Sequence, residues 1–145
     1  VNDRRRSIHD LEPLKNLITS APATFVSLQW PAEDVEELAP FLQSGRLLDY
    51  VHLRSNFADT AALVSALDGV LTVDTSIAHL AGALGRPTWL LLHHAPDWRW
   101  MVEGNHSPWY PSFKLYRQAK PGDWAPVIAA AAGGDQLVAI ETETG

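Results

Sequence analysis

Four polar residues occur close together in the middle of the chain, at Asp74, Thr75, Ser76 and His79, and the hydroxyls and the imidazole among them are suited to binding an anion. Within residues 70–84, an apolar run is followed by a segment of helical period, so the four are expected at a turn from strand to helix. Such turns lie at the carboxyl end of a strand, where open α/β sheets bind ligands, and the N–H groups of a helix start attract anions. The pattern predicts a phosphate-binding turn.

The helix expected over residues 75–84 has two different faces, because steps of three and four residues return to the same side. One face, expected to pack on the sheet, carries Ile77, Leu80, Ala81 and Leu84. The opposite face, expected to line a crevice or meet solvent, carries Thr75, His79, Gly82 and Arg86. A hydroxyl, an imidazole and a bare backbone patch would therefore be available to a ligand.

Asp74 would repel a bare phosphate, so it is expected either to cap helix N–H groups or to accept hydrogen bonds from sugar hydroxyls. A second interpretation is that Asp74 and Thr75 only cap the helix, and that His79 is an ordinary surface or packing histidine. This second interpretation is reasonable because a strand, a helix cap and a helix follow one another in every α/β fold of this kind. The residues alone leave both interpretations open.

Apolar runs of strand length alternate with segments of helical period, which is typical of a parallel sheet with crossover helices. Strands are predicted over residues 25–29, 48–53, 70–74, 88–92 and 114–118. Helices are predicted over residues 11–18, 33–42, 60–67, 75–84 and 124–132, the third capped by Asp59 and the last by Asp123. The fold class is therefore α/β, with one domain over residues 1–132 and a tail over residues 133–145.

Residues 93–112 interrupt this alternation with many Pro, Trp and His residues. A loop this long is usually functional or disordered, and order is favoured here by the aromatic residues Trp98, Trp100, Trp109 and Tyr110. Tryptophans in such a segment are more often core than stacking surfaces. Asp97 and Arg99 could shape a sugar pocket or form an internal ion pair.

The adjacent His93 and His94 suggest a metal site, but neighbours on an extended segment point to opposite sides, so no metal is predicted.

Composition limits the function further. The 145 residues, of which 46% are hydrophobic, suffice for one compact domain but not for two. A net charge of -6 argues against non-specific binding to nucleic acid or anionic membrane. The lack of cysteine excludes disulfides and thiolate metal sites and fits a cytoplasmic localisation. No apolar run is long enough for a membrane span. The N-terminus has no apolar signal-peptide core and does not begin with methionine, so we expect a segment of a longer protein or a chain trimmed of a tag.

The segment VDTSIAHLAGALGRP, residues 73–87, is similar to the Asp-Thr-x-x-x-His-x-x-x-Ala-x-Gly-x-Pro signature of family 9 glycosyltransferases, the heptosyltransferase group. The longer string FADTAALVSALDGVLTVDTSIAHLAGALGRPTWLLL, followed by APDWRW, SPWYPS, KLYRQ and GDWAPVI, resembles the C-terminal half of bacterial enzymes of that type fused to tetratricopeptide repeats. This resemblance covers residues 2–128.

The resemblance implies the GT-B architecture, in which two Rossmann-like domains face a cleft. This chain would be the C-terminal one, a three-layer sandwich with a mostly parallel sheet that holds a nucleoside-diphosphate sugar as donor substrate. Catalysis in the group uses neither metal nor cofactor, which agrees with the lack of a carboxylate cluster here.

The resemblance also implies roles for single residues. Asp74, Thr75, Ser76 and His79 would contact the diphosphate and sugar, His79 donating to the charge that builds on the leaving phosphate. Gln29 would lie near the nucleotide, unless it merely faces a loop. Arg6 and Ser7 match an Arg-Ser pair of relatives, so Arg6 would clamp a phosphate, although the basic run at the N-terminus could equally be a solvated end.

Two departures from the family narrow the prediction. Relatives have a strand of the type Gly-Leu-Val-Trp just before the segment that opens this chain, so the sheet is expected to lack its central strand and to form a homodimer through the exposed edge. The acceptor domain, which supplies the general base, is also missing, so no catalytic residue is assigned and the chain alone is expected to transfer no sugar. The alternatives are a non-catalytic interaction module, or another phosphate-ligand α/β domain such as a sugar-nucleotide epimerase.

Overall fold

A computed structural model describes residues 7–29, 36–101 and 103–133. Its strands are β1 (Phe25–Ser27), β2 (Leu47–Asp49), β3 (Val70–Val73), β4 (Thr88–Leu92) and β5 (Phe113–Arg117). Its α-helices are α2 (Glu12–Ser20), α3 (Ala39–Gln43), α4 (Phe57–Ala66), α5 (Ser76–Ala83) and α6 (Ala125–Ala132). Three 3-10 turns complete the described part: η1 (Glu36–Leu38), η2 (Val51–Leu53) and η3 (Trp98–Trp100).

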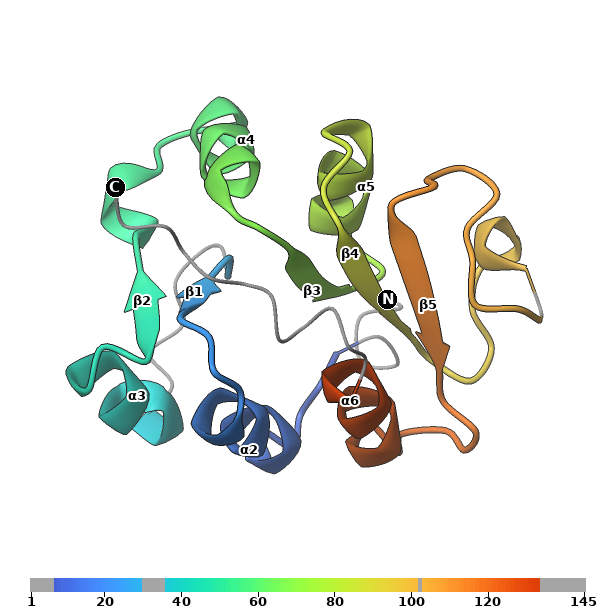
Figure 1. Ribbon diagram of the computed structural model, residues 1–145, viewed down its shortest axis with the longest axis horizontal. Helices are drawn as coiled ribbons and strands as arrows, with labels where there is room; N and C mark the ends of the chain where they lie inside the picture. The colour runs from blue at the N-terminus through green and yellow to red at the C-terminus, as the bar shows by residue number, and fades with distance from the viewer. Residues whose placement is uncertain (1–6, 30–35, 102, 134–145) are drawn as a thin grey trace.

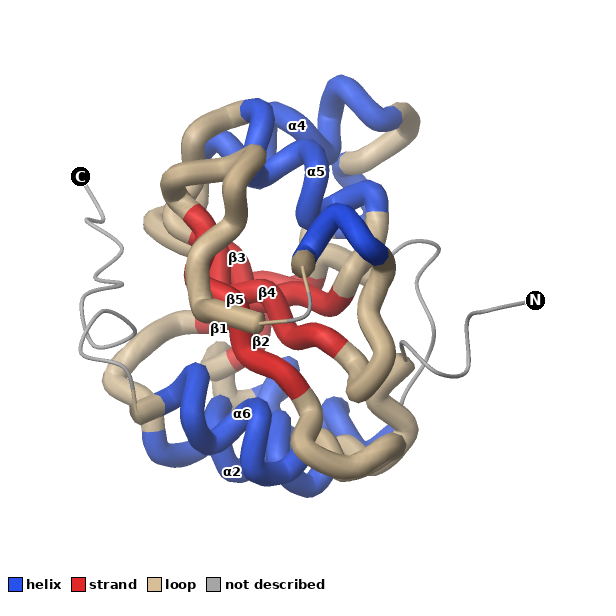
Figure 2. The backbone as a smooth tube through the Cα atoms, turned by 90° about the vertical axis from the view of Figure 1, so that its right-hand side faces the viewer, coloured by secondary structure: helices blue, strands red, loops and turns tan. Residues whose placement is uncertain are grey.

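The strands form the middle of three layers (Figure 1). Helices α4 and α5 cover one face of this layer, and α2 and α6 cover the other, as Figure 2 shows from the side. Every pairing between the strands is parallel. The predicted three-layer α/β sandwich with a parallel sheet is thereby confirmed.

The strand layer is divided into two sheets. Strands β1 and β2 form one sheet, and β3, β4 and β5 form the other in that order. In Figure 1 the layer runs β2, β1, β3, β4, β5, so the break lies between β1 and β3. Among the described residues, no strand pairs with the inner edge of β1 or with that of β3. A sheet that lacks its central strand would show such a break.

The hydrogen bonds show which peptide groups face this break. The N–H of Phe25 donates toward β2 at 3.0 Å, and the N–H of Val70 donates toward β4 at 2.9 Å. Successive peptide groups of a strand point to opposite sides, so those of Val26 and Leu71 point into the break. The inner edges therefore present backbone donors and acceptors to each other without a strand between them.

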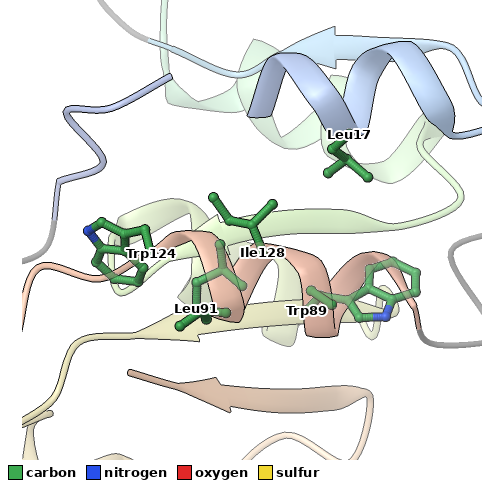
Figure 3. Packing of buried hydrophobic residues seen from close by; sticks show 7 residues of the cluster. Leu17, Trp89, Leu91, Trp124 and Ile128 are labelled. Carbon is green, nitrogen blue, oxygen red and sulfur yellow. The ribbon is translucent and has the colours of Figure 1, made fainter. Parts of the chain in front are cut away.

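Strand β4 is the centre of the core. All five of its residues are buried, as expected for a parallel strand covered on both faces. Its Trp89 and Leu91 pack against Leu17 of α2 and against Trp124 and Ile128 around α6 (Figure 3). On the opposite face, beneath α5, a second cluster comprises Ala78, Leu90, Leu92, Trp100, Phe113 and Leu115. This second cluster supports the candidate site.

The segment before α4 differs from its prediction. The strand expected over residues 48–53 ends at Asp49, and Val51–Leu53 is the 3-10 turn η2. Asn56, not Asp59, is the N-cap of α4: the N–H of Asp59 donates to Asn56 Oδ1 at 3.0 Å, and the N–H of Asn56 donates to Asp59 Oδ2 at 3.3 Å. This reciprocal capping box satisfies two donors, which a cap at Asp59 could not do.

Two further helices also differ from their predicted bounds or caps. Residues 33–35 of the helix expected over 33–42 lie outside the described residues, and the rest divides into η1 and α3. The N-cap of α6 is Trp124 instead of Asp123, with no side-chain hydrogen bond and with a proline in the first turn. Because proline has no N–H, fewer donors need a cap there. The tail from residue 134 onward lies outside the described residues.

Candidate ligand-binding site

The turn from β3 into α5 presents two hydroxyls to solvent. Thr75 is the N-cap of α5, with extended backbone angles, and its side chain makes no capping hydrogen bond. Its Oγ1 lies 3.4 Å from Thr72 Oγ1, while Thr75 and Ser76 are both exposed. Asp74 is buried, with 6% of its surface exposed. A ligand at this helix start would meet hydroxyls and backbone N–H groups before the carboxylate.

The buried face of α5 is centred on small residues. Ala78 and Ala81 are fully buried, whereas Ile77 and Leu80 are half-buried and Leu84 is 38% exposed. The predicted apolar face is confirmed for Ile77, Leu80 and Ala81, which pack in a cluster with Val70 of β3. Leu84 is exposed instead, and Ala78 is buried in a second cluster. Alanines allow the helix to approach the sheet closely, and this close packing outweighs the burial of larger side chains.

The opposite face of α5 is covered by an aromatic side chain from the loop before β5. A Cβ added at Gly82 would lie 2.5 Å from Cδ1 of Tyr110, so the ring lies directly on the glycine. The expectation that Gly82 offers a bare backbone patch to a ligand is therefore wrong. Glycine is required there because the tyrosine ring occupies the position of a side chain.

His79 is held by this aromatic cover. Its Nδ1 lies 3.1 Å from the Tyr110 hydroxyl, and its ring stacks on Trp100 with centroids 5.6 Å apart. Its Nε2 lies 3.9 Å from Asp74 Oδ1, and 37% of the side chain remains exposed. The roles of the two ring nitrogens depend on the tautomer: with the proton on Nε2, Nδ1 accepts from the Tyr110 hydroxyl. His79 is thus held in one orientation at the first turn of α5.

An open pocket of about 480 Å³ adjoins this histidine. It is lined by His79, Trp98, Arg99, Trp100, Trp109 and Tyr110. Trp100 is fully buried, as the sequence favoured, but Trp98 is 76% exposed and Trp109 is 58% exposed. These two tryptophans are surface residues of the pocket and not core residues.

Short-range contacts hold η3 in the pocket wall. Arg99 Nη2 and Asp97 Oδ2 form an ion pair at 3.1 Å, which confirms the second of the two roles considered for these residues. The N–H of Arg99 donates to Asp97 Oδ1 at 3.1 Å, and the indole N–H of Trp109 donates to the carbonyl of Arg99 at 3.0 Å. The two exposed tryptophans are thereby linked through the backbone of η3.

Arg117, at the end of β5, ties the same segment to the sheet. Its guanidinium donates to the carbonyls of Trp100, of Met101 at 2.9 Å and of Gly104 at 3.2 Å. Partial burial lowers the pKa of Arg117, which still leaves it protonated at neutral pH. Met101 has a positive φ of 60°, a conformation that needs support from its surroundings. Arg117 supplies this support.

Comparison with known proteins identifies the family of this chain. The sequence pattern of Glycosyltransferase family 9 (heptosyltransferase) matches residues 23–97, which include β1 to β4 and the turn before α5. The chain belongs to glycosyltransferase family 9. The matched range ends at Asp97, so five of the six residues that line the pocket lie beyond it.

Protein FlbA of Caulobacter vibrioides is similar to this family 9 chain. The two are 27% identical over 135 residues, which are 90% of this chain and 22% of FlbA. The chain therefore spans about a fifth of the length of that relative. No solved structure matches this chain.

The remaining predicted residues of this family 9 chain lie elsewhere in the fold. Gln29 is exposed after β1, and its carbonyl accepts from Arg54 Nη2 at 2.7 Å. The carbonyl of Ser7 accepts from the indole N–H of Trp124 at 3.2 Å, at the start of α6. Arg6 lies outside the described residues. Of the predicted set, the structure brings together Asp74, Thr75, Ser76 and His79.

Across residues 7–29, 36–101 and 103–133, no group of three His, Asp or Glu side chains could hold a metal ion. None of the described helices combines the length and the apolar character that a membrane span requires.

The sequence did not reveal Tyr110 as a partner of His79. It lies 31 residues further along the chain, in a loop whose path no periodicity predicts. The available signal was the aromatic content of residues 93–112, which indicated order but not which residues meet.

Proposed function

We propose that this chain is the donor-binding half of a GT-B glycosyltransferase and that it binds a nucleoside-diphosphate sugar at the turn between β3 and α5. The observation that carries this proposal is His79, fixed by Tyr110 and Trp100 at an exposed helix start. A surface histidine without a function has no need of such fixation. Membership of family 9 supports a nucleotide sugar as the ligand.

The diphosphate would lie on donors alone. Backbone N–H groups at the start of α5, the hydroxyls of Thr75 and Ser76, and Nε2 of His79 all donate to oxygen. Such an arrangement can stabilise a diphosphate leaving group without a metal or a cofactor. Because Asp74 is buried beside His79, we assign it the orientation of that imidazole, with any direct contact limited to sugar hydroxyls.

Three other residues complete the proposal. Gln29 would lie near the nucleotide, and Arg6 would clamp a phosphate beside Ser7. We further propose that the parent is a bacterial enzyme with tetratricopeptide repeats and an N-terminal acceptor domain. The length of FlbA, of which the chain matches 22%, leaves room for such parts.

The chain alone should transfer no sugar. Activation of the attacking hydroxyl needs a general base, which we place in the acceptor domain. The site described above contains donors to the leaving group but no such base directed at an acceptor. Weak binding of the donor is therefore the activity expected of this half.

Calorimetric titration with UDP, GDP and ADP, and with UDP-glucose, GDP-mannose and ADP-glucose, tests the proposal. One nucleotide series should bind saturably, and His79→Ala should weaken it about ten-fold or more, because hydrogen bonds to charged groups contribute about 1.5–3 kcal/mol. His52→Ala, an exposed histidine in η2, is the matched control and should have no effect. Absence of binding to this chain and to its full-length parent would overturn the proposal.

A second candidate function rests on the break between β1 and β3. Within the part of the chain that the structure describes, neither inner edge has a strand partner, which favours addition of a strand from another chain. The domain could then serve as an interaction module or homodimer that has kept the family fold without its chemistry. This candidate predicts self-association and no effect of His79→Ala on any ligand.

A further inference from the structure

The pocket beside His79 is distinct from the phosphate-binding turn. Its volume of about 480 Å³ lies within the range of small-molecule sites, roughly 300–1,000 Å³. Its walls come from η3 and from the loop before β5, beyond the residues that match the family. His79 is the residue that the turn and the pocket share.

The pocket walls are apolar and fixed. Trp98 and Trp109 expose most of their surfaces beside the same pocket, and contiguous exposed apolar surface marks interaction sites such as ligand-binding grooves. Trp109 is held by its indole N–H on the carbonyl of Arg99 and by its backbone N–H on Ser107 Oγ, at 3.0 and 3.1 Å. A ligand would find a flat apolar surface already in place.

Two donors in the wall have no acceptor. Nε of Arg99 and Nε1 of Trp100 are buried and make no hydrogen bond within the described part of the chain. An unsatisfied buried donor is costly, so each such group requires an explanation. Both atoms are closed to solvent in this structure, so the surface that a ligand meets directly is the pair of exposed indoles, Trp98 and Trp109.

We propose that this pocket holds the glycosyl ring of the donor, with an apolar face against the exposed indoles of Trp98 and Trp109. The inference rests on the proposed function, since it places the terminal phosphate at His79. The glycosyl carbon is bonded to that phosphate, whereas the base is separated from it by a second phosphate and a ribose. The ring next to His79 is therefore the sugar.

Titrations of Trp98→Ala and Trp109→Ala test this assignment. Affinity for the nucleotide sugar should fall about ten-fold, the loss expected when one ring face is no longer buried, while affinity for the free nucleoside diphosphate stays unchanged. Saturation-transfer NMR should show the hexose protons losing contact with the protein while the nucleoside protons keep it. Trp98→Phe should restore most of the affinity. Phe57→Ala, with a side chain 57% exposed on α4, is the matched control.

Each of the other possible outcomes of these titrations would contradict the assignment of the pocket to the sugar. Equal weakening of nucleotide and nucleotide sugar would make the pocket a base site and overturn the assignment. No weakening of either would separate the pocket from the donor, again overturning it while the proposed function stands. If no nucleotide binds, both the proposed function and this assignment fail.

Discussion

At the scale of single residues, the site depends on how one imidazole is held. His79 is in contact with the Tyr110 hydroxyl on one ring nitrogen, near Asp74 on the other, and stacked on Trp100. Tyr110 can approach this closely only because residue 82 is glycine. A helical glycine lowers helix stability by about 1 kcal/mol relative to alanine, but at position 82 it leaves room for the Tyr110 ring that contacts His79.

Gly82→Ala should destabilise the protein although it improves helix propensity. The added methyl overlaps the Tyr110 ring, and overpacking costs about 1–3 kcal/mol, which exceeds the propensity gain. Urea unfolding measures the net loss, and near-UV circular dichroism reports the displaced ring. Ala83→Gly, at the next and exposed position, should cost about 1 kcal/mol and leave the near-UV spectrum unchanged. A more stable Gly82→Ala variant would contradict the contact.

At the scale of elements, helix ends are set by side chains within a few residues. In α4 the carboxylate of Asp59 accepts from the backbone and hydroxyl of Ser55, both at 2.8 Å, and from the backbone of Asn56. The backbone N–H of Ser55 is the largest reason that the pKa of Asp59 lies below its ordinary value of 3.8. The charged form is thereby favoured in the folded state.

This capping box predicts an acid-dependent contribution to stability. Because the pKa of Asp59 is lower in the folded state, its contribution is present above the ordinary pKa and is lost as the pH falls through the folded value. Asp59→Asn should therefore destabilise α4 at pH 7 and have progressively less effect as the pH falls below the ordinary pKa of 3.8. Urea midpoints at pH 7 and at a series of acidic pH values measure this. Asp68→Asn, at an exposed position outside the helix, is the control for the loss of one negative charge; equal curves for the two variants would refute the prediction.

At the scale of the whole molecule, the break in the strand layer is the main unusual feature. The helices of both faces bridge it, and Leu28, which follows β1, packs against the cluster that contains Val70 of β3. Side-chain packing therefore joins the two sheets where backbone pairing does not. By contrast, the outer edge of β5 meets residue 105, whose carbonyl accepts from Leu115.

The break predicts concentration-dependent self-association, because inner-edge peptide groups can pair with a strand of a second copy. Light scattering should show a dimer at high protein concentration. Val26→Pro should reduce dimer formation, since it removes an N–H that faces the break and leaves the bond from Phe25 toward β2 in place. Val26→Thr keeps the N–H and is the control. A monomer at all concentrations would remove the support for this interface.

The sequence by itself determined the fold class, the order of strands and helices, and the polar turn at Asp74 to His79, because periodicity is a local property of the chain. It failed where distant segments compete: the exposed Trp98 and Trp109 and the cover on Gly82 depend on the path of residues 93–112. Only the tertiary structure decided that Tyr110 meets His79, 31 residues away, because packing between segments follows shape and not spacing.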